Sequence, residues 1–579
     1  MSYQAAPRRD NSTLMARLFT SRWGRVLLLG LICGVSFFLH NGASEVSLME
    51  SRNFVAAREM VAGGSWLIPT MNHELRLAKP PLPTWAVAGL QRLIGPTQNL
   101  ALLRVPAGLA ATLLVFFFWG LARALTRGQP AEATAPGRTA WLAALVLATS
   151  LLVVTTGREG QWDIFATSLA IGGLWLLVEG WQRPVRQAYL WLAGAGVLLG
   201  MAMLSKGPVP IYALVLPFLL AYFIGRPTHR QALRARTAGT VLAAGLAVVI
   251  GGSWPLYIWL KVAPAARAVA RVEIASWGER HVQPVWYYWP FFAFTGLWAL
   301  VALAALVWPY ARPRLRGYLP YGVALGWLLA GLLLLSIVPE KKERYMLPLM
   351  PPLALLVAGL LRYWQSQELG GGLPARTGWL PDSWLPRTWG ALLVLLLLAL
   401  PVAMVLTGFT GFGLGSVRFG LVVALVVALG VGLVRQGILR RQVNFLIGST
   451  LVVVVSIIAL VMPAYPRWEG RRDVPGQRQL RQLPGLRGVG EWYSLDTLHV
   501  KQVWAAGQAV PIWHPTVDQL AGLAHPVVTV SGQPAEESLP AGWADVVRIT
   551  RQDSFYLDRG RNSAVWFVSR LEPIIQIKK

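Results

Sequence analysis

The sequence predicts a polytopic α-helical membrane protein with a small α/β domain at its C-terminal end. The chain of 579 residues is 55% hydrophobic and only 14% charged, with a mean hydropathy of +0.49. Soluble proteins carry charge on roughly a quarter of their residues. Several stretches, among them 392–409 and 445–463, also contain no charged residue. A run of about 18 such residues is long enough to cross a bilayer as one helix.

Thirteen apolar stretches are predicted to cross the membrane, and some are short enough to leave room for merged or tilted spans. They lie at 26–40, 101–122, 140–156, 164–180, 188–204, 208–224, 238–260, 287–308, 319–338, 346–361, 389–408, 418–434 and 443–463. The first stretch is interpreted as a span and not as a cleavable signal peptide, because no small-residue cleavage site follows it.

The distribution of arginine predicts a cytoplasmic N-terminus, because basic residues gather in cytoplasmic loops. The N-terminal segment and every second loop contain arginines, at positions 8, 9, 17, 22, 25, 123, 127, 138, 183, 186, 226, 230, 234, 236, 312, 314, 316, 435, 440 and 441. The opposite loops carry most of the acids. An odd number of spans then places the C-terminus outside the cytoplasm. The net charge of +27 is thereby explained by topology and by contact with anionic headgroups, and no nucleic-acid partner is expected.

Three regions are predicted along the chain. Residues 1–25 form a basic cytoplasmic N-terminus, 26–465 form the transmembrane domain, and 466–579 form a soluble extracytoplasmic domain. The transmembrane domain has two long outside loops, at 41–100 and 261–286. The first loop contains amphipathic stretches at 46–61 and 82–93 that suit helices at the membrane interface. Alternating stretches at 527–531, 545–549 and 564–568 indicate strands in the C-terminal domain.

The first outside loop contains candidate phosphate-binding residues. Glu50, Arg58 and Glu59 lie on one helix-like stretch. Lys79 is followed by two prolines, which favour an extended residue and then a helix start. A lysine ahead of a helix N-terminus places a cation beside free N–H groups, which suits a phosphate. The alternative is a lysine that snorkels at a helix end.

Other outside loops add charges that topology does not explain. Asp163 opens the fourth span, either as a helix N-cap or as a second acid facing the first loop. Lys341, Lys342 and Arg344 are basic on the side where basic residues are disfavoured, which predicts an anionic ligand. The same side carries three further cationic or titratable positions, Lys206, Arg280 and His281.

No metal site or other cofactor is derivable from the sequence. Cys33 is the single cysteine, which excludes an internal disulfide and a cysteine-based cluster. No two histidines have metal-ligand spacing. The outside acids and cations instead fit group transfer, in which a carboxylate acts as general base and cations hold a leaving phosphate.

Five motifs in order carry a family resemblance. They are AREM with Gly64, Trp66, Pro69 and KPPL; GREGQWD; LSKGPVP; WPLYIW; and KKERYMLPLMP, within about residues 25–360. The chain resembles the aminoarabinose transferases of the dolichyl-phosphate-mannose-protein mannosyltransferase-like group, whose fold is called GT-C. The resemblance implies sugar transfer from a polyprenyl-phosphate donor to a lipid A-like or protein acceptor on the extracytoplasmic face of the cell inner membrane. It also implies donor-phosphate contacts for Lys79, Arg344 and Tyr345, and a second acid at Asp163.

The chain departs from the family pattern at two positions. The family begins the first loop with Asp-Glu, whereas this chain has Met49-Glu50. Relatives often have Glu where this chain has Ala78, so a metal held by that Glu is not expected. We therefore assign Glu50 as the general base, with Asp163 in support. Arg58, Lys206, Lys341 and Arg280 are predicted to assist the three phosphate-binding residues.

Two other functions stay open at this point. The first is a transporter or flippase of a lipid-linked sugar, although we find no internal repeat and no polar residues at mid-membrane, which transporters usually show. The second is a non-catalytic sensor on the same scaffold, which Met49 keeps open.

Overall fold

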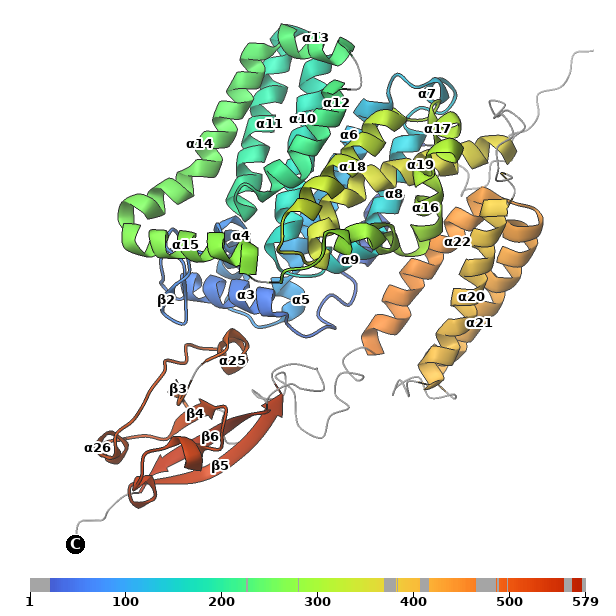
Figure 1. Cartoon of the computed structure of the whole chain (residues 1–579). Coiled ribbons are helices and arrows are strands. Elements are labelled where there is room, and N and C mark those ends of the chain that lie inside the picture. The colour runs from blue at the N-terminus through green and yellow to red at the C-terminus, as the bar shows by residue number, and fades with distance from the viewer. Residues whose placement is uncertain are drawn as a thin grey trace, which may run out of the picture.

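The computed structural model describes residues 21–224, 227–279, 281–368, 382, 384–406, 416–464, 486, 489–496, 498–556 and 565–574. Figure 1 shows a body of membrane helices, a group of three helices (α20–α22) beside it, and a small sheet domain beyond one end. The described ranges contain nine helices long and apolar enough to cross a membrane, or up to eleven with two bent pairs. The predicted polytopic α-helical fold with a C-terminal sheet domain is thus confirmed.

The nine spanning helices match predicted spans. They are Leu100–Thr126 (α5 and α6), Trp162–Gln182 (α10), Val185–Lys206 (α11), Thr237–Lys261 (α14), Val285–Leu306 (ending in α16), Glu343–Glu368 (ending in α19), Trp384–Val402 (in α20), Val417–Leu439 (beginning with α21) and Val443–Val461 (beginning with α22). Among them, α10 is the most deeply buried.

The other four predicted spans are shorter or broken. Helix α2 (Arg22–Phe37) and helix α18 (Tyr321–Ile337) are single apolar helices of 16 and 17 residues. The stretch Ile211–Ile224, ending in α12, is followed by α13 (Pro227–Ala235). Every predicted span therefore coincides with an apolar helix, and the total of thirteen stays a prediction.

The third predicted span is bent where a straight helix was expected. Helices α8 (Arg138–Ala148) and α9 (Leu151–Gly157) meet at 61°. The Thr149 hydroxyl donates to the Leu145 carbonyl at 2.7 Å, and the Ser150 hydroxyl donates to the Val146 carbonyl at 2.7 Å. Side-chain hydroxyls that bond back to the preceding turn compete with the helical ladder and bend it.

The first outside loop folds as predicted for its two amphipathic stretches. Helix α3 (Leu48–Val61) and helix α4 (Leu82–Ile94) pack together, and a short hairpin of β1 (Thr70–Met71) and β2 (Glu74–Leu75) joins them. Glu59 holds the hairpin, because its carboxylate accepts from the Thr70 hydroxyl at 2.6 Å and from the Asn72 N–H at 2.6 Å. The second outside loop forms helix α15 (Ala263–Glu279), which Figure 1 shows near α3 and α4.

The opposite end of the body carries short connections, and Figure 1 shows α7 (Pro130–Thr134) and α17 (Trp308–Leu315) there. The C-terminal domain is a sheet with strand order β3-β4-β6-β5. Its strands are Trp492–Ser494, Val527–Ser531, Val547–Tyr556 and Val565–Pro573 for β3 to β6. Strands β4, β5 and β6 confirm the three predicted strands. Short helices α25 (Val500–Ala506), α26 (Val517–Ala521) and α27 (Ala535–Ser538) complete the domain.

Candidate active site

A cavity of about 630 Å³ opens where several predicted outside loops meet the ends of the spans. Its polar wall comes from α3, the segment before α4, the start of α10, the end of α11, α15 and the segment after α18. Its apolar wall comes from span ends and includes Ala166, Ala213, Leu214, Leu335 and Val338. The fold thus brings together charged residues that lie up to about 300 positions apart in the sequence, beside a surface suited to a lipid chain.

Asp163 forms the centre of a charge cluster in this cavity. Its carboxylate pairs with the Lys206 ammonium through one oxygen and lies 3.6 Å from the Arg344 guanidinium through the other. The Lys206 ammonium also lies 4.3 Å from the centre of the Tyr345 ring. The N-cap of α10 is Gln161, so Asp163 lies in the first helical turn and the N-cap alternative is wrong. The negative charge is still favourable there because of the helix dipole.

Two further ion pairs line the cavity. The Lys79 ammonium lies 3.1 Å from the Glu273 carboxylate of α15, just ahead of α4 as the prolines predict. The Lys342 ammonium lies 2.6 Å from Glu340, and the Tyr345 hydroxyl donates to the same Glu340 oxygen at 3.3 Å. Burial would raise the pKa of Glu340, but Lys342 and Tyr345 outweigh it and hold that pKa below its usual value.

Glu50 lies outside the cavity, contrary to the role predicted for it. Its side chain is completely buried. The Arg104 guanidinium donates to both oxygens of its carboxylate, at 2.6 and 2.8 Å. The N–H groups of Gly160 and Ser47 donate to the same carboxylate at 2.8 and 2.9 Å. Burial would raise the pKa of Glu50, but Arg104 and these N–H groups lower it. A carboxylate so enclosed has no free access to a substrate proton. Its neighbour Met49, at the family's Asp position, faces the cavity instead.

The sequence motifs did not identify Arg104 as the partner of Glu50, although one feature of the sequence indicates a buried role for it. It is a lone arginine within the predicted span 101–122, and its side chain is fully buried. Charged residues inside membrane spans almost always face a partner. That rule predicts a buried carboxylate partner for Arg104.

Two of the predicted phosphate-binding residues do not line the cavity, and a third lies outside the described residues. Arg58 is half-buried and donates to the Val503 carbonyl of the C-terminal domain at 3.3 Å. Lys341 is buried, and its ammonium donates to the carbonyls of Val338 and Gln283 at 2.7 and 3.0 Å. Arg280 lies outside the described residues. The neighbour of Lys341, Lys342, lines the cavity instead, because successive residues in extended backbone point to opposite sides.

Glu159 is a cavity carboxylate that the sequence placed only among the outside acids. It lies between α9 and α10, and its carboxylate accepts from the Gln161 side chain at 2.5 Å. Burial and the negative charge of Glu50 raise the pKa of Glu159 to about 7, against the opposing charge of Arg104. Within the described residues, no cationic side chain lies within ion-pair distance of it.

Comparison with known proteins points to one family. The family model for dolichyl-phosphate-mannose-protein mannosyltransferase matches residues 78–259. The undecaprenyl phosphate-alpha-4-amino-4-deoxy-L-arabinose arabinosyl transferase of Edwardsiella ictaluri is 29% identical over 331 residues, which are 54% of this chain and 55% of the relative. A second such transferase, from Proteus mirabilis, is 26% identical over 53% of this chain and 54% of the relative. The chain thus spans about half the length of the curated relatives it matches.

The fold is that of a solved structure. ArnT from Cupriavidus metallidurans, bound to undecaprenyl phosphate, superposes with a TM-score of 0.67 over 95% of this chain and 98% of that chain, at 18% identity. Its apo state superposes with a TM-score of 0.62. The chain has the GT-C fold and is similar in sequence to the aminoarabinose transferases. The expected family resemblance and fold are confirmed.

The family match in this GT-C protein covers four of the cavity's charged residues. Lys79, Glu159, Asp163 and Lys206 lie within residues 78–259, whereas Met49 and Arg344 lie outside that range. Among the described residues, no group of three or more His, Cys, Asp or Glu side chains could hold a metal ion.

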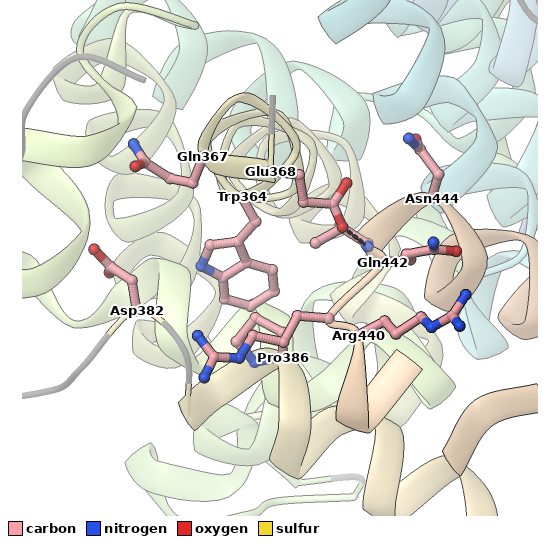
Figure 2. A pocket seen from close by; sticks show the side chains of 10 residues that line it. Trp364, Gln367, Glu368, Asp382, Pro386, Arg440, Gln442 and Asn444 are labelled. Atoms are coloured by element: carbon pink, nitrogen blue, oxygen red, sulfur yellow. Dashed lines mark hydrogen bonds between the residues drawn. The ribbon is translucent and has the colours of Figure 1, made fainter. Parts of the chain in front are cut away.

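A second cavity in the GT-C protein, of about 730 Å³, is shown in Figure 2. It is lined by Trp364, Glu368, Asp382, Arg440 and neighbouring residues. The continuous helix Glu343–Glu368 connects the two cavities, with Tyr345 at one end and Trp364 near the other. At 1.5 Å per residue, they lie about 30 Å apart along this helix, at opposite ends of the bundle. Glu368 and Asp382 flank residues 369–381 in the sequence, which lie outside the described part of the chain.

Proposed function

We propose that this protein is a glycosyltransferase that moves a sugar from a polyprenyl-phosphate donor to an acceptor. One observation carries the proposal. Four cationic side chains, which come from three segments far apart in the sequence, line one cavity whose other wall is apolar. They are Lys79, Lys206, Lys342 and Arg344. An excess of cations beside apolar span ends suits a ligand with a phosphate head and a hydrocarbon tail.

The donor phosphate would lie between Lys79, Lys206 and Arg344, with Tyr345 against the Lys206 ammonium. Asp163 would hold Lys206 and Arg344 in position while the phosphate is absent, because it pairs with both. As the sugar leaves, negative charge grows on the phosphate, and preorganised cations stabilise that charge more than they stabilise the ground state. The relatives, which are named for undecaprenyl phosphate, support a donor of this class.

The protein is proposed to lie in the cell inner membrane, with the cavity and the C-terminal domain outside the cytoplasm. The acceptor is a glycolipid of the lipid A type or a protein. The cavity charges lie at span ends and in loops, and not along a mid-membrane path, which argues against a transporter.

The decisive measurement compares binding and transfer. Lys79→Ala is expected to weaken binding of undecaprenyl phosphate by the purified protein about 10-fold or more, because a charge-assisted contact is worth about 1.5–3 kcal/mol. Lys261→Ala, at the exposed end of α14, is the matched control and should bind as the parent does.

Mass spectrometry of envelope lipids and glycoproteins from a strain lacking this protein should show the loss of one sugar-modified species. Re-expression of the parent should restore that species. If the purified protein moved the sugar across a bilayer and never onto an acceptor, the transferase proposal would be replaced by the transporter alternative.

A further inference from the structure

The carboxylates that line the cavity differ in how they are paired. Four carboxylates line it, those of Glu159, Asp163, Glu273 and Glu340. Asp163, Glu273 and Glu340 each form an ion pair with a lysine or arginine of the same cavity. Glu159 has no cation within ion-pair distance among the described residues, and its hydrogen-bond partner is the neutral Gln161 side chain. A salt bridge stabilises the charged form of a carboxylate and so makes it a weaker base, which leaves Glu159 as the strongest base of the four.

The backbone beside Glu159 is fixed from two sides. The Gly160 N–H donates to the Glu50 carboxylate at 2.8 Å, and the Gly160 carbonyl accepts from the Asn53 side chain at 2.8 Å. A side chain at position 160 would clash with the Phe54 ring of α3. The buried Glu50–Arg104 pair therefore positions Glu159 at the wall of the same cavity that Met49, at the family's Asp position, also lines.

The charge of the cavity limits the acceptor. Among the described residues, five cationic side chains line it, which is one more than the four carboxylates. They are Arg52, Lys79, Lys206, Lys342 and Arg344. A polyprenyl-phosphate sugar is a phosphodiester with one negative charge, so the donor alone balances the charge of the described lining residues. An acceptor phosphate would add one or two further negative charges beside Glu159, and uncompensated charge in a partly buried site is costly.

We propose that Glu159 is the general base of this site and that the acceptor is a neutral hydroxyl group. The inference rests on the proposed glycosyltransferase function and specifies its acceptor. A hydroxyl is a weak nucleophile that gains from a positioned base, whereas a phosphate is already ionised at neutral pH and needs none.

The reaction balances with groups already named. The acceptor oxygen forms a bond to the anomeric carbon of the sugar, and the bond from that carbon to the phosphate oxygen breaks. The phosphate oxygen keeps the electron pair and leaves as polyprenyl phosphate with a second negative charge, held by Lys79, Lys206 and Arg344. The acceptor proton moves to the Glu159 carboxylate and is later released to water.

The surroundings of Glu159 suit this role near neutral pH. The charged groups that face it are Glu50 from α3, Arg104 from the start of α6, Asp163 from α10 and Arg344 from the segment after α18. Their combined effect with burial is the raised pKa of about 7. A base with a pKa close to the working pH combines a useful ionised fraction with a strong driving force for proton uptake.

The first experiment identifies the linkage in the product. Envelope material from cells with and without the protein is compared by mass spectrometry, and the species that gains the sugar is treated with cold aqueous hydrofluoric acid. That reagent cleaves phosphate esters and leaves O-glycosidic bonds intact. The sugar is expected to remain on the acceptor. Release of the sugar from the acceptor by this treatment would show a phosphate linkage and overturn the inference while leaving the proposed function standing. The absence of any protein-dependent sugar would refute the proposed function itself.

The second experiment tests the residue. Glu159→Gln is expected to lower the transfer rate about 10²-fold or more while undecaprenyl phosphate binding stays within a factor of about two, since general-base catalysis contributes about 10²–10⁴-fold. Glu159→Asp should keep measurable transfer, and its rate should still rise with pH. Glu74→Gln, on the exposed strand β2, is the control. If Glu159→Gln transferred sugar at the parent's rate, or kept the parent's pH profile, Glu159 would not be the base.

Discussion

At the scale of single residues, the buried ion pair of Glu50 and Arg104 determines how the site is built. Both side chains are completely buried, and the two residues lie 54 positions apart in the sequence. The sequence made Glu50 prominent through its position in the motif, but no local pattern shows which partner a carboxylate will meet after folding. The Glu50–Arg104 ion pair therefore could not be predicted from the sequence motifs. The lone arginine in a predicted span, Arg104, indicated only that a buried partner exists.

Glu50→Gln is expected to destabilise the protein instead of acting only on catalysis. The substitution leaves the Arg104 guanidinium buried without a counterion, and breaking a buried pair costs about 3–5 kcal/mol. The thermal unfolding temperature of the purified protein measures this loss. A double substitution to apolar residues, Glu50→Leu with Arg104→Leu, should recover much of the stability because no unpaired charge remains. A Glu50→Gln variant with the parent's unfolding temperature but no transfer would return Glu50 to the role of base.

The choice between Lys341 and Lys342 shows another limit at the residue scale. Composition singled out the basic segment, and two of its residues, Lys342 and Arg344, line the cavity. It could not decide which of two adjacent lysines faces inward, because that depends on the extended backbone at Lys342. In extended backbone, successive side chains point to opposite sides, so a shift of one residue would turn Lys341 toward the cavity and Lys342 away from it.

At the scale of elements, apolar runs and amphipathic stretches predicted most of the fold. Each predicted span coincides with an apolar helix, and both interface stretches became helices, α3 and α4. These patterns are informative because a helix in a bilayer satisfies its own backbone hydrogen bonds. The bend between α8 and α9 was missed, because it depends on hydroxyl bonds of Thr149 and Ser150 that many straight helices also tolerate.

The close approach of α3 to the segment before α10 gives a prediction at this scale. Gly160→Ala would place a methyl group against the Phe54 ring of α3, so either the helix or the Glu159 backbone must shift. A shift of about 1 Å in a catalytic group can lower a rate about 100-fold. We therefore expect the rate of sugar transfer by Gly160→Ala to fall about 100-fold, while its binding of undecaprenyl phosphate is retained.

Gly89→Ala is the matched control for this prediction, since a methyl group there meets no atom within 4 Å. In a helix this change is neutral or mildly stabilising. If both alanine variants transferred sugar at the parent's rate, the Gly160 contact would not be required to position Glu159.

At the scale of the whole molecule, the C-terminal domain is tied to the helix that borders the cavity. The Asn72 side chain donates to the Val510 carbonyl at 2.8 Å and accepts from the Val510 N–H at 2.7 Å. The Phe54 and Trp504 rings lie 5.5 Å apart, and α25 packs on α3 (Figure 1). Helix α3 carries Met49 and Arg52 into the cavity. The domain thus supports one wall of the site, and none of its described residues lines the cavity.

Asn72→Ala tests this coupling. It removes both side-chain bonds to Val510, each worth about 0.5–1.5 kcal/mol, and frees the docked segment. Amide hydrogen exchange is expected to rise in α25 and on the face of α3 that it covers, and the transfer rate is expected to fall because Met49, Arg52 and the Glu50 anchor share that helix. Glu537→Ala, exposed on α27, should change neither quantity. Faster exchange in α25 with unchanged exchange in α3 and an unchanged transfer rate would mean that the domain is attached to the site but does not support it.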